Sequence, residues 1–356
     1  MDEDRTAEGT APPGFGIQGE KGRMSGKLRV ALIGFGGMGH CHAAQYQGQK
    51  DVKLVALCDK DPGVFAQGEA QLNIGRTGAI DVSGYHLYRS YRELTAKEKF
   101  DILDICLPCP LHARYAIRAM EDGYHVLTEK PMARTLPQVD RMIAAARATG
   151  RKLMVAQVVR FMPHYRYVAD ALREEKLGKL LRLSARRNAG MPKRAWYHDA
   201  RQSGGALLDL HLHDLDFVQS IYGLPQAVLG QGITRESGGI DDLMASFFYA
   251  NGPVVNLESS WCRGAFDATL AAICENGTYE ISGQTVTTYH RDGTSETLDF
   301  SKEKNGYFRE IAYFASCVAA DREPEFCSVE SVRRSMQLAF AEERSVRCGR
   351  KLRVRA

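Results

Sequence analysis

The stretch LRVALIGFGGMG, residues 28–39, decides the fold class of this chain of 356 residues. Its first half is an apolar run rich in β-branched residues, which is typical of a buried parallel strand. The glycines that follow have the spacing G-x-G-x-x-G, and residues 40–48 have helical spacing. A second apolar run, residues 52–58, ends in Asp59, 20 residues after Gly39. A strand, this glycine motif, a helix and an acid in this order predict a Rossmann unit, which binds a dinucleotide.

Each residue type in the motif has a distinct role. Gly34 permits the tight turn, Gly36 lets the backbone approach a pyrophosphate, and Gly39 lets the helix pack closely on the strand. The free N–H groups at the helix N-terminus hold the phosphates. Asp59 would accept hydrogen bonds from the ribose hydroxyls and repel a 2′-phosphate, so NAD is favoured over NADP; the alternative is a solvated loop acid. The predicted cofactor contacts of this unit are Gly34, Phe35, Gly36, Gly37, Met38, Gly39, Asp59 and Lys60.

Strands and helices continue to alternate after this unit. Strands are predicted at 100–107, 124–128 and 153–157, and helices at 111–122 and 136–149. This alternation predicts an α/β fold with a doubly wound parallel sheet. Ligands of such sheets bind outside the carboxyl ends of the strands. Gly34, Asp59, Pro108 and Lys130 fall at such ends, so we expect them to share one crevice.

Composition excludes several other classes of protein. The net charge of +4 is spread along the chain, unlike the clustered basic residues of nucleic-acid-binding proteins. No apolar run approaches the roughly 20 residues of a membrane span. Residues 1–26 are polar and rich in Gly and Pro, which predicts a disordered leader, and translation could start at Met24.

The cysteines and adjacent histidines need a separate interpretation. Nine cysteines without a regular pattern favour free thiols and a cytoplasmic location. Cys106 and Cys109 form a CxxC, for which a redox or metal role is the alternative to a buried strand end. His40, Cys41 and His42 point about 100° apart on a helix, so they cannot converge on one ion. No metal is therefore expected.

Several motifs together resemble one family. VALIGFGGMGHCH, Asp59, ICLPCPLH, TEKPMA and GGALLDLHLHDLDFV are similar to the glucose–fructose oxidoreductase/inositol dehydrogenase/MocA family, over nearly the whole chain from Leu28. The resemblance implies a Rossmann domain at 28–157 and a substrate-binding α+β domain at 158–356. The second domain would contain a large open, mostly antiparallel sheet that pairs two chains in a dimer or tetramer. The sequence is compatible, with alternating strands at 180–188, 227–232, 242–249, 254–261, 269–274 and 277–281 and helices from Gly306 and over 329–344.

The resemblance also implies the catalytic residues. Lys130 would contact the nicotinamide ribose and the substrate hydroxyl, where its ammonium favours the alkoxide. Asp209 and His213 are four residues apart, so on a helix they share one face. Histidine suits general-base work near neutral pH, which is the role implied for His213. Asp209 would orient the substrate, or else merely cap the helix.

The stretch LDLHLHDLD, residues 208–216, contains further candidates. His211 lies about 200° around a helix from His213, so the two could share a metal only on a strand. It could instead line the substrate pocket. Asp214 and Asp216 lie outside the pair, and Asp216 matches the trailing acid of the family, for which we expect a structural role or a role in supporting the residues that contact the substrate. The weaker substrate candidates are Arg160, Trp196, His211 and Tyr307. The resemblance adds Leu107, Pro108, His112, Glu129 and Lys130 to the cofactor site.

These features predict an NAD-dependent oxidoreductase that acts on a secondary hydroxyl of a sugar, a sugar derivative or a cyclic polyol. One alternative is redox-assisted glycoside cleavage through a 3-keto-glycoside, which needs the same first step. A non-catalytic nucleotide-sensing regulator would tend to lose Lys130 and His213, and both are present. A metal hydrolase is the third alternative, and metal analysis of the purified protein would identify it.

Overall fold

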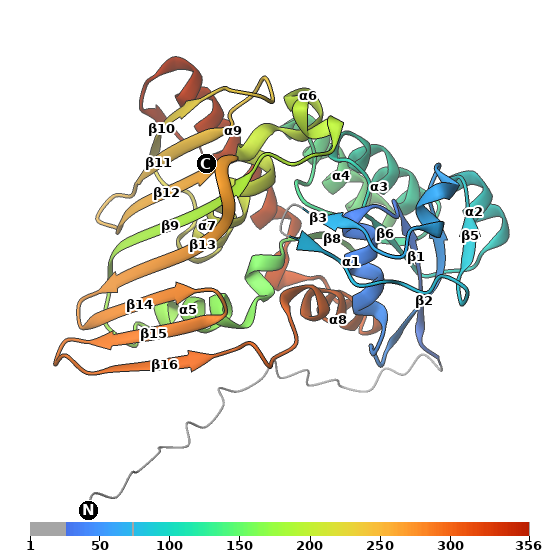
Figure 1. The fold of residues 1–356 in the computed structure, drawn as a ribbon, viewed down its shortest axis with the longest axis horizontal. Helices are drawn as coiled ribbons and strands as arrows, with labels where there is room; N and C mark the ends of the chain where they lie inside the picture. Colours follow the sequence, from blue (N-terminus) through green and yellow to red (C-terminus); the bar gives the residue numbers. More distant parts are fainter. Residues whose placement is uncertain (1–25, 73–74, 356) are drawn as a thin grey trace, which may run out of the picture.

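The computed structural model describes residues 26–72 and 75–355. Nearly all of the predicted leader, residues 1–25, lies outside the described residues. The described chain forms two domains, each built on its own sheet (Figure 1). Within the described residues, no helix is both long and apolar enough to cross a membrane.

The first domain is the predicted Rossmann domain. Its sheet has six parallel strands in the order β5-β2-β1-β6-β7-β8. Their bounds are β1 Leu28–Ile33, β2 Val52–Cys58, β5 His86–Tyr88, β6 Ile102–Ile105, β7 His125–Glu129 and β8 Leu153–Ala156. The strand order reverses direction on either side of β1, which places the ligand crevice of such a sheet at the end of this strand.

Helices connect these strands: α1 Gly37–Tyr46, α2 Tyr91–Lys97, α3 His112–Glu121 and α4 Leu136–Thr149. Of these, α1, α3 and α4 lie at the predicted places. Local sequence sets their ends: the Thr135 hydroxyl accepts a hydrogen bond from Gln138 N at the start of α4, and Gly150 ends α4 in a left-handed conformation with φ of 66°. Three features were not predicted from the sequence: α2, β5 and the short antiparallel pair of β3 (Gln71–Leu72) and β4 (Gly75–Arg76).

The second domain has a nine-stranded sheet in the order β16-β15-β14-β13-β9-β12-β11-β10-β17. All neighbouring strands are antiparallel except β9 and β12. The strands are β9 Leu180–Gly190, β10 Ala227–Ile233, β11 Asp242–Phe248, β12 Val254–Ser260, β13 Cys262–Cys274, β14 Gly277–Ser282, β15 Thr285–His290, β16 Ser295–Asp299 and β17 Leu352–Arg353. This confirms the predicted open, mostly antiparallel sheet and extends it by β15, β16 and β17.

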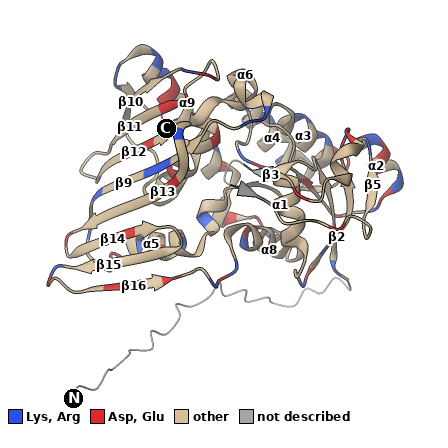
Figure 2. Ribbon diagram, in the orientation of Figure 1, with Lys and Arg blue, Asp and Glu red and all other residues tan. Residues whose placement is uncertain are grey.

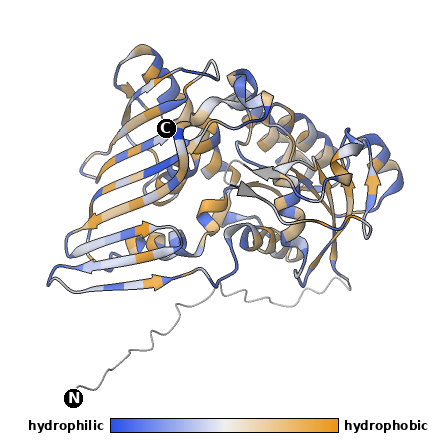
Figure 3. Ribbon diagram, in the orientation of Figure 1, coloured by the Kyte–Doolittle hydropathy of each residue, from blue (hydrophilic) through white to orange (hydrophobic). Residues whose placement is uncertain are grey.

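Three helices cover one face of this sheet: α5 Pro163–Arg173, α7 Leu212–Tyr222 and α9 Val329–Cys348. The other face is open (Figure 1). Along β11 and β12, exposed Met244 and Val254 alternate with buried Leu243 and Val255, so apolar side chains lie on the open face as well. The two sheets differ in hydropathy: in Figure 3 the Rossmann strands are mostly hydrophobic, whereas the strands of the large sheet mix hydrophobic and hydrophilic residues.

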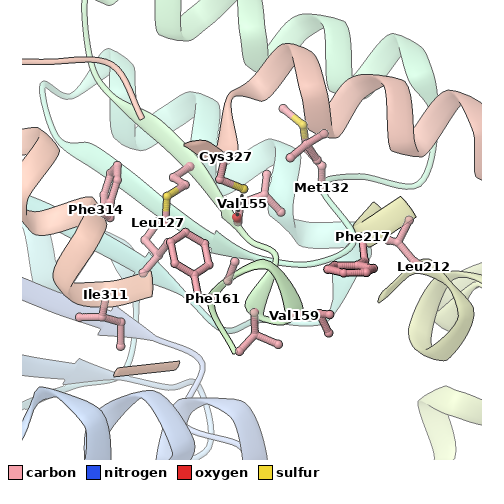
Figure 4. Packing of buried hydrophobic residues seen from close by; sticks show 14 of the residues in the cluster. Leu127, Met132, Val155, Val159, Phe161, Leu212, Phe217, Ile311, Phe314 and Cys327 are labelled. Atoms are coloured by element: carbon pink, nitrogen blue, oxygen red, sulfur yellow. Dashed lines mark hydrogen bonds between the residues drawn. The ribbon is translucent and has the colours of Figure 1, made fainter. Parts of the chain in front are cut away.

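A continuous core joins the two domains. Phe161 of the short helix η3 (Val158–Phe161) is fully buried and contacts Phe326 edge-on, with ring centroids 5.1 Å apart. Around it lie Leu127 of β7, Val155 of β8 and side chains of α8 (Gly306–Ala319), as Figure 4 shows. Because α8 packs on α1 as well as on η3, the C-terminal part of the chain supports the Rossmann helix that begins at the glycine motif.

Candidate active site

The glycine loop leaves no room for larger residues. Gly34 has φ of 94°, and a Cβ on it would lie 2.7 Å from the carbonyl group of Cys106. A Cβ on Gly39 would lie 2.1 Å from the Gly34 carbonyl oxygen, so α1 packs directly on the turn. Gly36 is the N-cap of α1 and offers no side-chain cap. The first N–H groups of α1 are therefore left for an anion such as a phosphate.

Asp59 ends β2 beside this loop. One carboxylate oxygen accepts a hydrogen bond from Phe35 N at 2.8 Å, and the other accepts one from Asp61 N at 3.0 Å. The carboxylate thus holds the glycine loop, and each oxygen keeps a lone pair for a ribose hydroxyl. Lys60 beside it is exposed. A close-packed glycine loop, an uncapped helix start and an acid at the next strand end fit a dinucleotide.

Lys130 lies just beyond β7 and reaches across to the second domain. Its Nζ donates to Asp209 Oδ1 at 2.9 Å and to the Asp209 carbonyl oxygen at 2.5 Å. Both side chains are largely buried, with exposed fractions of 13% and 14%. Glu129 accepts a hydrogen bond from Lys130 N through its own side chain, and the Lys130–Pro131 peptide bond is cis. Residues 79 positions apart in the sequence therefore form one charged pair between the domains.

His213 is the third member of the predicted set. Its Nδ1 is buried and has no hydrogen-bond partner among the described residues, which leaves Nε2 as the nitrogen available to a substrate. Burial, and then the positive charges of Lys130 and Arg187, hold the pKa of His213 well below its usual value. The structure thus keeps this imidazole neutral and close to Lys130, which suits a proton acceptor.

The stretch 208–216 is not an α-helix throughout. Residues Leu207–His211 form a π-helical turn, which continues directly into α7. Such turns are frequent at functional sites. Asp209 and His213 both still lie near Lys130. The other polar residues of the stretch bond to different partners: His211, Asp214 and Asp216.

The other acids of this stretch each pair with a different arginine. Asp214 accepts two hydrogen bonds from Arg187, at 2.8 and 2.9 Å, and Asp216 accepts two from Arg160, both at 2.7 Å. These pairs are buried, and desolvated ion pairs of this kind need complete hydrogen bonding to be tolerated. The structural role predicted for Asp216 agrees with this geometry.

Two predicted substrate contacts, His211 and Arg160, are buried and bonded to other partners, so we correct these predictions. His211 is fully buried, with its ring nitrogens 3.1 Å from Ser259 Oγ and 3.3 Å from Glu342 Oε1, so it binds β12 to α9. Arg160 is 4% exposed, and its guanidinium donates to Asp216, to the Phe326 carbonyl oxygen just before α9 and to Ser331 in the first turn of α9. These polar side chains stand at buried positions because each one hydrogen-bonds to another element of the second domain.

The remaining predicted residues surround the crevice in different ways. The ring nitrogens of His112 lie 2.9 Å from the Pro131 carbonyl oxygen and 2.7 Å from that of Leu107, so His112 holds two strand ends together. Pro108 lies beside Leu107 at one of these ends, partly exposed. Trp196 is partly exposed and stacks on Tyr197 at 3.8 Å. Tyr307 starts α8 and packs near the His42 ring, with centroids 6.1 Å apart, which places it against α1.

A buried polar network near Lys130 was not predicted from the sequence. The nitrogens of His42 lie 2.9 Å from Asp104 Oδ2 and 3.1 Å from Glu129 Oε1, and Tyr46 donates to Asp104. Burial alone would lower the pKa of His42, but the charges of Asp104 and Cys106 and the hydrogen bonds to them together raise this pKa well above its usual value. The ring is therefore protonated between two carboxylates. An acid inside the apolar strand 102–105 was the available signal, since a buried charge needs a partner.

The His42, Asp104 and Cys106 ligand atoms lie within 4.8 Å of one another, the spacing of a metal site. Both imidazole nitrogens already face carboxylates, and a protonated imidazole has no lone pair for a metal. The geometry therefore favours a salt-bridged network that supports Glu129 and, through it, the backbone of Lys130.

The buried histidines predict how stability depends on pH. Burial, and then the charge of Arg187, lower the pKa of His164 in α5 to about 4, from 6.5 in the unfolded chain. Between these values the unfolded chain binds a proton that the folded chain does not. His164 therefore contributes stability that is present above pH 6.5 and is lost as the pH falls to about 4, with a slope of up to about 1.4 kcal/mol per pH unit.

We expect the free energy of unfolding of the variant His164→Asn to depend less steeply on pH than that of the wild-type chain. Urea unfolding at pH 7, 6 and 5 would show a smaller fall in the free energy of unfolding than for the wild-type chain. His290→Asn, in an exposed part of β15, is the matched control and should leave the slope unchanged. Equal slopes for His164→Asn and wild type would show that His164 is not held neutral by the fold.

Comparison with known proteins places both domains in one group. Residues 28–157 match a family model described as the oxidoreductase family with an NAD-binding Rossmann fold, GFO_IDH_MocA. Residues 165–280 match the model of the GFO/IDH/MocA C-terminal domain. The first domain is thus an NAD-binding Rossmann domain, in agreement with the fit of its glycine loop and Asp59 to a dinucleotide.

Individual relatives are more distant. The chain is 30% identical to D-glucoside 3-dehydrogenase of Escherichia coli over 211 residues, which is only 56% of this chain and 56% of that protein. It is 26% identical to scyllo-inositol 2-dehydrogenase (NADP(+)) IolU of Bacillus subtilis, over 67% of this chain and 75% of that one. The crystal structure of the WlbA dehydrogenase from Bordetella pertussis, in complex with NADH and UDP-GlcNAcA, has a TM-score of 0.79. It covers 94% of this chain and 99% of its own at 20% identity, which is a likeness of fold.

Proposed function

We propose that this chain, which belongs to the GFO/IDH/MocA family of oxidoreductases, moves a hydride between NAD and a secondary hydroxyl carbon of a sugar, a sugar derivative or a cyclic polyol. The observation that carries the proposal is the contact of Lys130 with Asp209 beside a neutral His213. This set lies at the end of β7, and ligands of a parallel sheet bind at this edge.

The three side chains have complementary tasks in such a reaction. When bound, the nicotinamide ring accepts the hydride. His213 Nε2 takes the hydroxyl proton, because the imidazole is neutral and its other nitrogen is buried. The Lys130 ammonium stabilises the alkoxide that forms, and it is largely shielded from water, which strengthens its field. Asp209 fixes Lys130 and accepts a hydrogen bond from a second substrate hydroxyl.

The proposed contacts of the cofactor follow from the loop geometry. The pyrophosphate would lie on the N–H groups of Gly37 to Gly39, and the ribose hydroxyls on Asp59. Leu107, Pro108, Glu129 and Lys130 would line the nicotinamide half of the crevice from the ends of β6 and β7. His112 would contribute by holding these two strand ends in place.

We expect NAD to be preferred over NADP because the Asp59 carboxylate repels a 2′-phosphate. The named cofactor of the IolU relative is NADP, so the preference needs its own test. The variant Asp59→Ser should raise the ratio of kcat/KM for NADP to that for NAD by about tenfold or more, since a negative charge is removed. Asp61→Ser, two residues further on and outside the predicted contacts, is the control. An unchanged ratio in Asp59→Ser would contradict the role of Asp59.

A second candidate function is the oxidation of glycosides at C3, which can lead to cleavage of the glycosidic bond. The relative named D-glucoside 3-dehydrogenase favours it. The same Lys130, Asp209 and His213 would serve the first step. The two candidates differ in the product, because cleavage releases the aglycone and returns the nicotinamide to its starting state.

The proposal is tested by NAD reduction across inositols, hexoses, sugar acids and glycosides, followed at 340 nm. Release of the aglycone from chromogenic glycosides is measured in parallel. Reduction by a member of this panel supports the dehydrogenase, and aglycone release without net reduction supports the second candidate. A chain that binds NADH but turns over no member of the panel would instead behave as the non-catalytic regulator.

We also propose that two chains associate through the open face of the nine-stranded sheet. Exposed Met244 and Val254 on this face support the proposal, since apolar side chains gain by being covered. In Figure 2 the charged residues of this domain are spread among uncharged ones.

A cytoplasmic location is proposed from the nine free cysteines.

A further inference from the structure

Arg194 lies against the glycine loop although it belongs to the second domain. It stands in the segment between β9 and η4 (Ala195–His198). A Cβ built on Gly36 would meet Arg194 first: Nη1 at 2.8 Å, Cζ at 3.8 Å and Nη2 at 3.9 Å. The guanidinium therefore lies directly over the residue at which the backbone must approach a pyrophosphate.

This position is electrostatically unfavourable for a cation by itself. Gly36 is the N-cap of α1, so the guanidinium faces the positive end of the helix dipole. In the described part of the chain, the Arg194 side chain has no hydrogen bond or ion pair, and it is exposed. An anion placed between the helix start and the guanidinium would be attracted by both. The dinucleotide that this domain binds carries such an anion.

The segment around Arg194 is held in place on both sides. His198 Nε2 lies 3.1 Å from the Pro192 carbonyl oxygen, and Tyr197 N donates to the Arg194 carbonyl oxygen at 3.0 Å. Arg134 of the Rossmann domain donates to the Ala200 carbonyl oxygen at 3.0 Å, which ties this segment to the first domain. The backbone thus presents the Arg194 side chain to the loop.

We infer that Arg194 binds the pyrophosphate of the cofactor and closes the cofactor site from the second domain. Its planar guanidinium can donate two parallel hydrogen bonds to phosphate oxygens, which makes Arg–phosphate pairs strong. Cofactor binding would then link the domain that carries Gly36 to the domain that carries Asp209 and His213. The inference rests on NAD binding and concerns a residue outside the proposed catalytic set.

The test is calorimetric titration of the full chain with ADP-ribose, which carries the pyrophosphate, and with adenosine, which lacks it. Arg194→Met should weaken ADP-ribose binding by at least about tenfold and leave adenosine binding unchanged. Arg194→Lys should bind ADP-ribose more tightly than Arg194→Met but more weakly than the wild type, because lysine keeps the positive charge and lacks the two parallel donors of the guanidinium. Lys193→Met, at the neighbouring exposed cation, is the matched control and should bind ADP-ribose like the wild type.

Unchanged ADP-ribose affinity in Arg194→Met would overturn the inference. Tighter binding would overturn it as well, since the guanidinium would then only block the site. An equal loss for adenosine and ADP-ribose would also contradict it, because the effect would not depend on the pyrophosphate. ADP-ribose has no nicotinamide, so these results are independent of whether the chain transfers a hydride.

Discussion

Replacing His213 with Asn is expected to lower kcat about 10²–10⁴-fold, because the reaction loses its proton acceptor. Asn has a similar size and fits the half-buried position, so KM for NAD should change little. The neutral state of His213 gives a second expectation for the wild type. Since the pKa of His213 is held well below its usual value, this residue should not cause an acid limb in kcat/KM between pH 6 and 8.

The measurement is NAD reduction by His213→Asn, by Lys130→Met and by the double variant. Because Lys130 and His213 act on one alkoxide, the double variant should lose far less than the product of the single losses. His86→Asn, in the exposed edge strand β5, is the control and should keep the wild-type kcat. More than half of the wild-type kcat in His213→Asn would contradict its role as the base.

Replacing Arg160 with Met is expected to lower the free energy of unfolding by about 3–5 kcal/mol, because it leaves the Asp216 carboxylate buried and unpaired. The guanidinium is 2% exposed and Asp216 is 1% exposed. The Arg160 guanidinium also donates to Ser331 Oγ at 3.1 Å and to the Phe326 carbonyl oxygen at 3.3 Å. Its loss therefore affects η3, α7 and the start of α9 together. Urea unfolding followed by circular dichroism measures this change.

Arg147→Met provides the matched control, because Arg147 pairs with Glu330 on the surface. The Arg147 side chain is 70% exposed and that of Glu330 is 47% exposed. That variant should lose less than about 1 kcal/mol. A similarly small loss for Arg160→Met would contradict the structural role. Arg160→Met chains that fold but show only a raised KM for the sugar would restore the substrate contact that the sequence suggested.

The Rossmann half was predictable because its signals are local. The glycine motif, the acid at Asp59 and the alternation of strands with helices each occupy a short window of sequence. The buried parallel strands are nearly continuous apolar runs, which mark them clearly. The catalytic residues Lys130, Asp209 and His213 were predicted because the motifs around them resemble those of the family. Their roles remain a prediction that the geometry supports.

What could not be predicted depends on contacts between distant residues. β15 and β16 lie toward one edge of the large sheet and carry many polar residues, so their pattern is weak. His211 and Arg160 have the residue types of a site, yet their partners Glu342 and Asp216 lie 131 and 56 positions away and hold them in the interior. The π-helical turn before α7 likewise follows from packing, since residues 207–211 differ little from an ordinary helix in composition.

The most direct test of the proposed reaction is transfer of a labelled hydride. The chain is incubated with NAD and with inositols and glucosides that carry deuterium at every ring carbon, and the reduced cofactor is analysed by mass spectrometry. We expect the reduced cofactor to gain one deuterium in the wild type, with formation slowed about 10²–10⁴-fold in His213→Asn. A cofactor that is reduced without gaining deuterium would contradict the proposed hydride transfer, and so would a cofactor that stays oxidised while neither an oxidised sugar nor an aglycone is formed.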